Sequence, residues 1–207
     1  MVVAFLRGCQ CYGTGVGEET MTPNETVTSP RDRLRPLMRV RQVRDHTDEP
    51  VSVAELDAIA DVARWSGSSR NSQPWRFIVI REERTLRAIG DAGMPQTRSF
   101  HTATAGIAIV MPSDPAHGVG DAYDEGRAAE RILIAASLLG LGAAISWIRS
   151  DVRAAIAELL ALPSDQYVRT VVALGHPTAA GQQPKAAPGT ARLPREEVVF
   201  EERWPAR

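Results

Sequence analysis

The sequence has little of several residue types on which common protein classes depend. Its two cysteines, Cys9 and Cys11, lie too close together and too near the N-terminus for a disulfide framework or a recognisable zinc site. It has a single lysine, Lys185, a formal net charge of -1 and no sustained basic face for nucleic acid. No apolar run approaches the ~20 residues of a membrane span, and the apolar stretch at residues 2–6 is too short for a secretory signal. These absences favour a cytoplasmic protein that binds neither nucleic acid nor membrane.

The composition that remains is that of a globular protein. Apolar residues make up 43% of the chain, and 207 residues are enough for one domain with a substantial core. Residues 1–30 mix Gly, Thr, Glu and Pro without a period, which predicts a disordered N-terminal extension before a single domain over residues 31–207. Helical and strand patterns then alternate without the regular repeat of a doubly wound fold. The sequence therefore predicts the α+β class, with a central mixed β-sheet flanked by helices.

The expected helices are marked by capping residues and apolar spacing. Ser52 and Glu55 form a capping box, and Pro36 suits the first turn of a short helix. The second half of the longest helix is apolar on nearly every side, which predicts burial all round, either in the core of one chain or against a partner. Helices are expected at residues 36–44, at 52–64, at 83–89 with a stop at Gly90, at 121–139 and at 151–162.

The expected strands are short apolar runs. Residues 77–80 are apolar and rich in β-branched side chains, which predicts a buried strand. Strands are expected at residues 76–81, 105–111, 143–147 and 167–174. Loops are expected at residues 94–100, where the loop would cover a pocket, at 112–120 and at 179–190. The histidines lack partners at metal-ligand spacing, so no metal site is assigned.

The loop between Trp65 and Trp75 is a run of small polar residues between a helix and a strand. Gly67 and the two serines after it carry little bulk, so a flat ring fits against their backbone, and the Asn71 amide offers donors and an acceptor. The candidate ligand-contacting residues are Gly67, Ser68, Ser69, Asn71 and Gln73. By itself, a Gly-Ser-Ser sequence is more typical of an ordinary turn.

Arginines form the second candidate group. Arg41 and Arg44 lie near the end of the first expected helix, and Arg192 precedes Leu-Pro near the C-terminus. The planar guanidinium donates two hydrogen bonds at once, which suits a phosphate. Taken alone, the first two arginines are more typical of a solvated helix end, which the helix dipole favours.

Taken together, these segments resemble the nitroreductase family. The resemblance rests on Ser-x-x-Asn-x-Gln-Pro-Trp from Ser68 to Trp75, on Arg41-Gln42-Val43-Arg44, on Gly140-Leu141-Gly142 before a strand, and on Arg192-Leu193-Pro194. It covers nearly all of the chain from about Arg33 onward. It implies a nitroreductase-like fold in an intertwined homodimer, with two FMN molecules at the interface.

The resemblance also implies a role for each candidate residue. Arg41, Gln42, Arg44 and Arg192 would contact the phosphate and ring edge of FMN. Gly67, Ser68, Ser69, Asn71 and Gln73 would lie on the flavin of the partner subunit, and the backbone of Ala144, Ile145 and Ser146 would run beside the ring. Three positions depart from the family pattern, since Gly67 replaces a proline, Val40 an arginine and Gln42 a serine. Arg39 is the candidate replacement for the arginine missing at Val40.

The resemblance implies an oxidoreductase in which flavin N5 carries the chemistry, so no catalytic side chain is assigned. NADH or NADPH would reduce the flavin, and a nitroaromatic, quinone or enone would then be reduced in a ping-pong hydride transfer. The sequence fits this mechanism because it offers no Ser or Cys in an activating motif. Two alternatives stay open: a non-enzymatic flavin carrier or sensor of the same fold, and a flavin-destructase or dehalogenase-like relative.

Overall fold

The computed structural model describes residues 29–114, 116–184, 186–187 and 189–205. Nearly all of the predicted N-terminal extension, including Cys9 and Cys11, lies outside these ranges. The chain divides into two units, residues 1–35 and 36–207, and the second unit holds the sheet and its core. Within the described ranges, no helix is both long and apolar enough to cross a bilayer.

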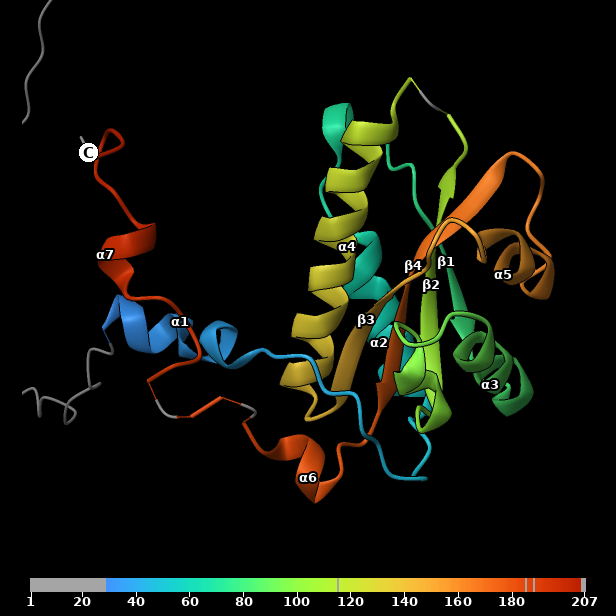
Figure 1. The fold of residues 1–207 in the computed structure, drawn as a ribbon, viewed down its shortest axis with the longest axis horizontal. Coiled ribbons are helices and arrows are strands. Elements are labelled where there is room, and N and C mark those ends of the chain that lie inside the picture. The colour runs from blue at the N-terminus through green and yellow to red at the C-terminus, as the bar shows by residue number, and fades with distance from the viewer. Residues whose placement is uncertain (1–28, 115, 185, 188, 206–207) are drawn as a thin grey trace, which may run out of the picture. The chain divides into compact units, whose positions relative to one another are not determined.

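The elements follow one another in a mixed order of helices and strands (Figure 1). The helices are α1 (Pro30–Arg39), α2 (Val53–Arg64), α3 (Glu83–Ala92), α4 (Gly118–Leu138), α5 (Arg153–Leu159), α6 (Ala179–Gln182) and α7 (Arg195–Val198). Two 3-10 turns are η1 (Ser69–Asn71) and η2 (Arg98–His101). The strands are β1 (Arg76–Ile80), β2 (Ala105–Pro112), β3 (Gly142–Trp147) and β4 (Gln166–Gly175). This combination confirms the predicted α+β class.

The four strands form one sheet in the order β1-β2-β4-β3. Each of the three strand pairs in the described part of the chain is antiparallel, so the sheet is antiparallel rather than mixed. The register of β2 and β4 pairs Ile107 with Val172 and shifts between Ile109 and Val110. The predicted burial of the first strand is only partly correct, because β1 lies at an edge and Val79 remains 39% exposed.

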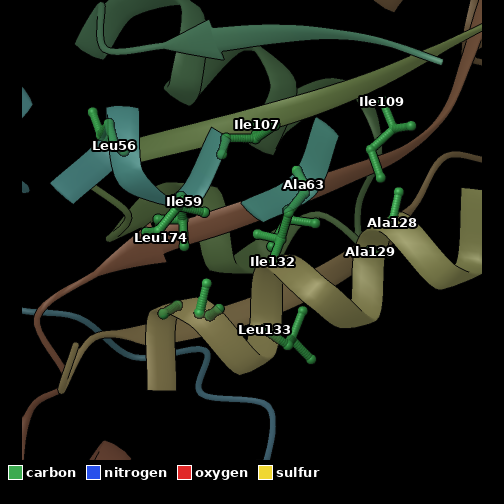
Figure 2. Packing of buried hydrophobic residues seen from close by; sticks show 14 of the residues in the cluster. Leu56, Ile59, Ala63, Ile107, Ile109, Ala128, Ala129, Ile132, Leu133 and Leu174 are labelled. Atoms are coloured by element: carbon green, nitrogen blue, oxygen red, sulfur yellow. The ribbon is translucent and has the colours of Figure 1, made fainter. Parts of the chain in front are cut away.

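Helices cover both faces of the sheet because the two central strands are apolar on both sides. Alternate residues of β2 point to opposite faces. Ile107 and Ile109 pack in one core cluster with α2 and α4, whereas Ala108 packs in a second cluster with Leu86 of α3 and Ile156 of α5. Figure 2 shows Leu56, Ile59 and Ala63 of α2 and Ala128, Ala129, Ile132 and Leu133 of α4 on the first face. The result is a three-layer arrangement with the sheet in the middle.

The helix termini follow local sequence at α2 and depart from it elsewhere. The Ser52 capping box forms as predicted, since the Glu55 N–H donates to Ser52 Oγ at 3.2 Å and the Ser52 N–H to Glu55 Oε2 at 2.9 Å. The prediction that Pro36 starts a helix is wrong. Helix α1 begins at Pro30, after Ser29, whose Oγ accepts the Asp32 N–H at 3.2 Å, and Pro36 lies inside it. Arg41 and Arg44 therefore follow the helix in an extended segment.

Three other helices differ from the prediction in length or position. Gly90 lies inside α3 instead of ending it, and the ring of His101 packs beside it: an added Cβ would lie 3.2 Å from His101 Cε1. Helix α5 is shorter than predicted at both ends, and Ala161 just beyond it adopts a positive φ of 52°. A short helix, α6, forms in the segment predicted to be a loop at residues 179–190.

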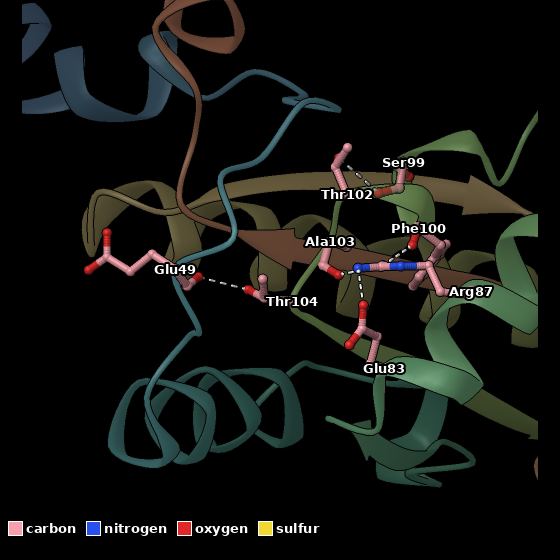
Figure 3. Close-up of polar contacts among 8 residues, drawn as sticks. All are labelled: Glu49, Glu83, Arg87, Ser99, Phe100, Thr102, Ala103 and Thr104. Atoms are coloured by element: carbon pink, nitrogen blue, oxygen red, sulfur yellow. Dashed lines mark hydrogen bonds and ion pairs between the residues drawn. The ribbon is translucent and has the colours of Figure 1, made fainter.

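The segment predicted to cover a pocket, residues 94–100, packs its second half against the core, whereas residues 94–96 are exposed. Phe100 is fully buried and Thr97 donates a hydrogen bond to the Gly90 carbonyl at 2.8 Å. Arg87 of α3 fixes its end by donating to the carbonyls of Phe100, at 2.5 Å, and Ala103, at 3.0 Å (Figure 3). The second half of this segment therefore supports the fold.

Candidate functional site

A hollow of about 580 Å³ brings together the arginines that the sequence singled out. Its lining consists of Met38, Arg39, Val40, Arg41, Gln42, Arg44, Pro184, Ala186, Ala191 and Arg192. Four arginines therefore face one space, and the lining residues include no carboxylate. We call this hollow the arginine pocket. Two segments some 150 residues apart in the chain form this pocket, because Arg192 lies against the segment that follows α1.

The arginines of this pocket differ in the hydrogen bonds that they already make within the protein. Arg41 donates from Nη1 to the carbonyl of Gly181 at 2.9 Å and from Nη2 to the carbonyl of Gln182, so its fork fastens the end of α6. Arg44 donates to the side-chain oxygen of Gln42 at 2.8 Å. Arg192 donates to the carbonyl of its neighbour Ala191 at 2.7 Å. Arg44 and Arg192 are consequently better placed than Arg41 to meet an incoming anion.

Strand β3 runs beside the first of these segments. The Val43 N–H donates to the Ala143 carbonyl at 2.8 Å. The contact is close because Gly142 lacks a side chain: a Cβ there would lie 2.8 Å from Val43 Cγ1. The three residues of β3 that are predicted to contact the flavin come directly after Ala143. Of these, Ala144 and Ser146 are buried and Ile145 is partly exposed. The segment from Arg41 to Arg44 therefore lies next to β3.

The remaining candidates lie at the other end of α4. The Ser69 N–H donates to Asp124 Oδ2 at 2.9 Å, in the second turn of α4, whereas β3 follows the C-terminal end of that helix. A helix of 21 residues is about 30 Å long. Gly67, Ser68, Ser69, Asn71 and Gln73 do not line the arginine pocket of their own chain. Within one chain, the two halves of the predicted flavin site, namely the arginine pocket and the loop after α2, are therefore separated.

The loop of residues 66–73, which we call the polar loop, has an unusual backbone. Arg70, Asn71 and Gln73 have positive φ angles of 51°, 55° and 50°. Side chains other than glycine adopt this left-handed region at a cost, and asparagine tolerates it best. Ser68 supports the turn, since its Oγ accepts the Gln73 N–H at 2.9 Å and its carbonyl accepts the Asn71 N–H at 3.1 Å.

Sequence reasoning missed a group of buried carboxylates at the start of α4. Asp121, Asp124 and Glu125 are 7%, 4% and 2% exposed. Glu125 forms an ion pair with Arg169 of β4, and Asp124 accepts hydrogen bonds from Ser69 and Arg127. Acidic residues near a helix N-terminus are also typical of exposed helices, which the dipole favours. The sequence thus offered no signal that these were buried.

A second missed residue is His46, close behind Arg44. It is 5% exposed, and burial lowers the pKa of its imidazole. Gly142 and Gly175 leave room for it, since a Cβ on Gly175 would lie 2.7 Å from His46 Cβ. His46 therefore supports the segment that carries Arg44.

Comparison with known proteins decides the family. The model of the nitroreductase family matches residues 37–176, which is more than half of the chain. The chain belongs to the nitroreductase family. A curated relative from Archaeoglobus fulgidus, provisionally named an NADH dehydrogenase/NAD(P)H nitroreductase, is 32% identical over 152 residues, which cover 70% of this chain and 84% of the relative.

Solved structures agree on the fold. An FMN-dependent nitroreductase from Clostridium difficile superposes with a TM-score of 0.68 and 24% identity, covering 80% of this chain and 97% of the other. The NADPH:FMN oxidoreductase from Vibrio harveyi, complexed with NAD+, has a TM-score of 0.71 and 21% identity and covers 84% and 78% of the two chains. The predicted nitroreductase-like fold is thereby confirmed.

Proposed function

We propose that this protein is an FMN-dependent oxidoreductase that uses NADH or NADPH to reduce small electron-poor acceptors, namely nitroaromatics, quinones or enones. Membership of the nitroreductase family supports the reaction class. The names of its relatives, which include an NAD(P)H nitroreductase and an FMN-dependent nitroreductase, support the cofactor and the reductant. The structural observation that carries the proposal is the arginine pocket, with four arginines and no carboxylate in its lining.

The residues of this pocket fit FMN. A phosphate monoester carries nearly two negative charges at neutral pH, and guanidinium groups bind it through charge-assisted hydrogen bonds. Arg44 and Arg192 would bind the phosphate, with Arg39 as a further donor, and Gln42 would hold Arg44 in place through its 2.8 Å hydrogen bond. A hollow of about 580 Å³ lies within the range of cofactor sites. Gln42 therefore has a positioning role at the point where the sequence departs from the family pattern.

Bound FMN would supply the centre that accepts and donates hydride. The protein's part is to bind and orient: β3 presents Ala144, Ile145 and Ser146 beside the segment that carries Arg44, so their backbone amides can contact the ring. The lining that the structure describes holds no Ser, Cys, Asp or Glu for a nucleophile or general base. We expect the reductant and the acceptor to use the same face in turn, which is a ping-pong order.

A homodimer completes this proposal. The predicted burial of the second half of α4 on every side is not met within one chain. Ile132 is fully buried, but Leu138 and Leu139 are 64% and 45% exposed. A second copy that covered these leucines would remove apolar surface from water. The same dimer would let the polar loop of one subunit meet the arginine pocket of its partner.

Spectroscopy and turnover together test the proposal. Titration with FMN should give a bound-flavin spectrum at about one FMN per chain, and the loaded protein should oxidise NADH or NADPH when a quinone or nitroaromatic is added. Double-reciprocal plots at several acceptor concentrations should be parallel. Protein that gains no flavin spectrum at micromolar FMN would refute the proposal. Flavin binding without NAD(P)H oxidation would instead support the carrier or sensor.

A further inference from the structure

We infer that Asp124 is a positioning residue that sets the shape of the polar loop before any cofactor arrives. The inference rests on the proposed function, because that function assigns the loop to the flavin site. It concerns a residue of α4 that does not line the arginine pocket and was not among the candidates taken from the sequence.

The loop needs an external restraint because its backbone is strained. Three of its residues other than glycine, Arg70, Asn71 and Gln73, have left-handed φ angles, and such residues persist only where the surroundings hold them. The bonds inside the loop are all local: they run from Asn71 and Gln73 to Ser68, from Ser72 to Ser69, and from the Gln73 side chain to the Asn71 carbonyl. Local bonds shape a turn but do not fix it to the rest of the domain.

Asp124 supplies the restraint. In the described part of the chain, the bond from the Ser69 N–H to Asp124 Oδ2, at 2.9 Å, is the one hydrogen bond that joins the loop to an element other than its chain neighbours α2 and β1. The carboxylate is 4% exposed, so little water competes for it. Its helix is held by packing just beyond this point, since Ala128 and Ala129 of the next turn lie in the core. A charge-assisted bond from a packed helix therefore fixes the first residue of η1.

Arg127 contacts the same loop, and it lies three residues after Asp124 on the same face of α4. It donates to Asp124 Oδ1 at 3.3 Å, and its guanidinium lies where a side chain on Gly67 would be, since an added Cβ would clash with Arg127 Nη2. The Arg127 side chain is 55% exposed, so solvent weakens its contribution. The buried carboxylate is the stronger of the two restraints, and Arg127 orients it.

Removing the carboxylate should loosen the loop more than the fold. Without Asp124, the Ser69 N–H can donate to water instead, because most of the loop is exposed. The left-handed residues would then relax, and FMN would have to reorder them on binding. That cost appears as weaker affinity.

The test uses three variants of Asp124 and one matched control. Asp124→Ala and Asp124→Leu both remove the acceptor, and leucine also refills the buried space in case the alanine variant folds poorly. Asp124→Asn keeps one carbonyl oxygen as an acceptor. Asp61→Ala is the control, because Asp61 and Arg64 form the same i,i+3 pair on α2, at 2.7 Å, but on an exposed surface.

Two readouts separate positioning from stability. In the flavin-free protein, hydrogen exchange of the amides of residues 69–73 should rise about tenfold in Asp124→Ala and Asp124→Leu, with exchange in the core strands β2 and β4 unchanged. The Kd for FMN should rise by about tenfold in the same variants, whereas Asp124→Asn should recover most of both and Asp61→Ala should match the unmodified protein.

The inference is overturned if loop exchange and FMN affinity stay as in the unmodified protein, or if Asp124→Asn is no better than the alanine and leucine variants. Its failure is distinguishable from failure of the proposed function. If the unmodified protein binds no FMN, the proposed function fails, while the exchange measurement still shows whether Asp124 holds the loop.

Discussion

Replacing Arg192 with alanine should weaken FMN binding by roughly 10- to 100-fold and leave riboflavin binding unchanged. In the described structure, the Arg192 guanidinium donates only to the carbonyl of Ala191, at 2.7 Å, so most of its donors are available for a phosphate. A hydrogen bond between charged partners contributes about 1.5–3 kcal/mol, and each 1.4 kcal/mol is about a factor of ten in Kd. Riboflavin lacks the phosphate and should not sense the change.

The assay is a titration of each ligand followed by flavin fluorescence, with two comparison variants. Arg195→Ala is the matched control, because Arg195 lies three residues away in α7 and lines a different hollow. Arg41→Ala should weaken FMN and riboflavin alike, because it releases the end of α6, and Pro184 just beyond that end lines the pocket. An equal loss of both ligands in Arg192→Ala, or no loss of FMN, would refute the assignment of Arg192 to the phosphate.

Three further predictions follow from burial and exposure. Ile132→Ala, at a fully buried position, should lower the free energy of unfolding by about 2–5 kcal/mol in urea titrations, and a loss under about 1 kcal/mol would contradict the packing in Figure 2. Leu138→Glu should shift the protein from the proposed dimer to a monomer in light scattering; a variant that stays dimeric would place the interface elsewhere, and a monomeric unmodified protein would refute the dimer. Burial lowers the pKa of His46 below its usual 6.5, so the unfolded chain binds the proton more readily and the free energy of unfolding should fall as the pH drops below about 6.5. His46→Asn should reduce the difference in melting temperature between pH 7.5 and 5.5, and an unchanged difference would argue against His46.

Local sequence determined the features that depend on neighbouring residues. The Ser52 and Glu55 capping box started α2 where the sequence placed it, because both partners lie within one turn. The apolar runs that became β2 and β4 were recognisable because both faces of these central strands are buried. The order of residue types in the polar loop and around the arginines resembles that of the nitroreductase family. This order was sufficient to predict the family from the sequence.

Only the tertiary structure decided which of these residues meet. Arg41 reaches the carbonyl of Gly181, 140 residues away, and nothing in its own segment indicated that its fork would be occupied there. The edge position of β1 follows from strand order, which depends on pairing between distant segments. The burial of Asp124 depends on the packing of α4 under the polar loop, because an acidic residue in the second turn of a helix has the same local sequence signal whether it faces water or a loop amide.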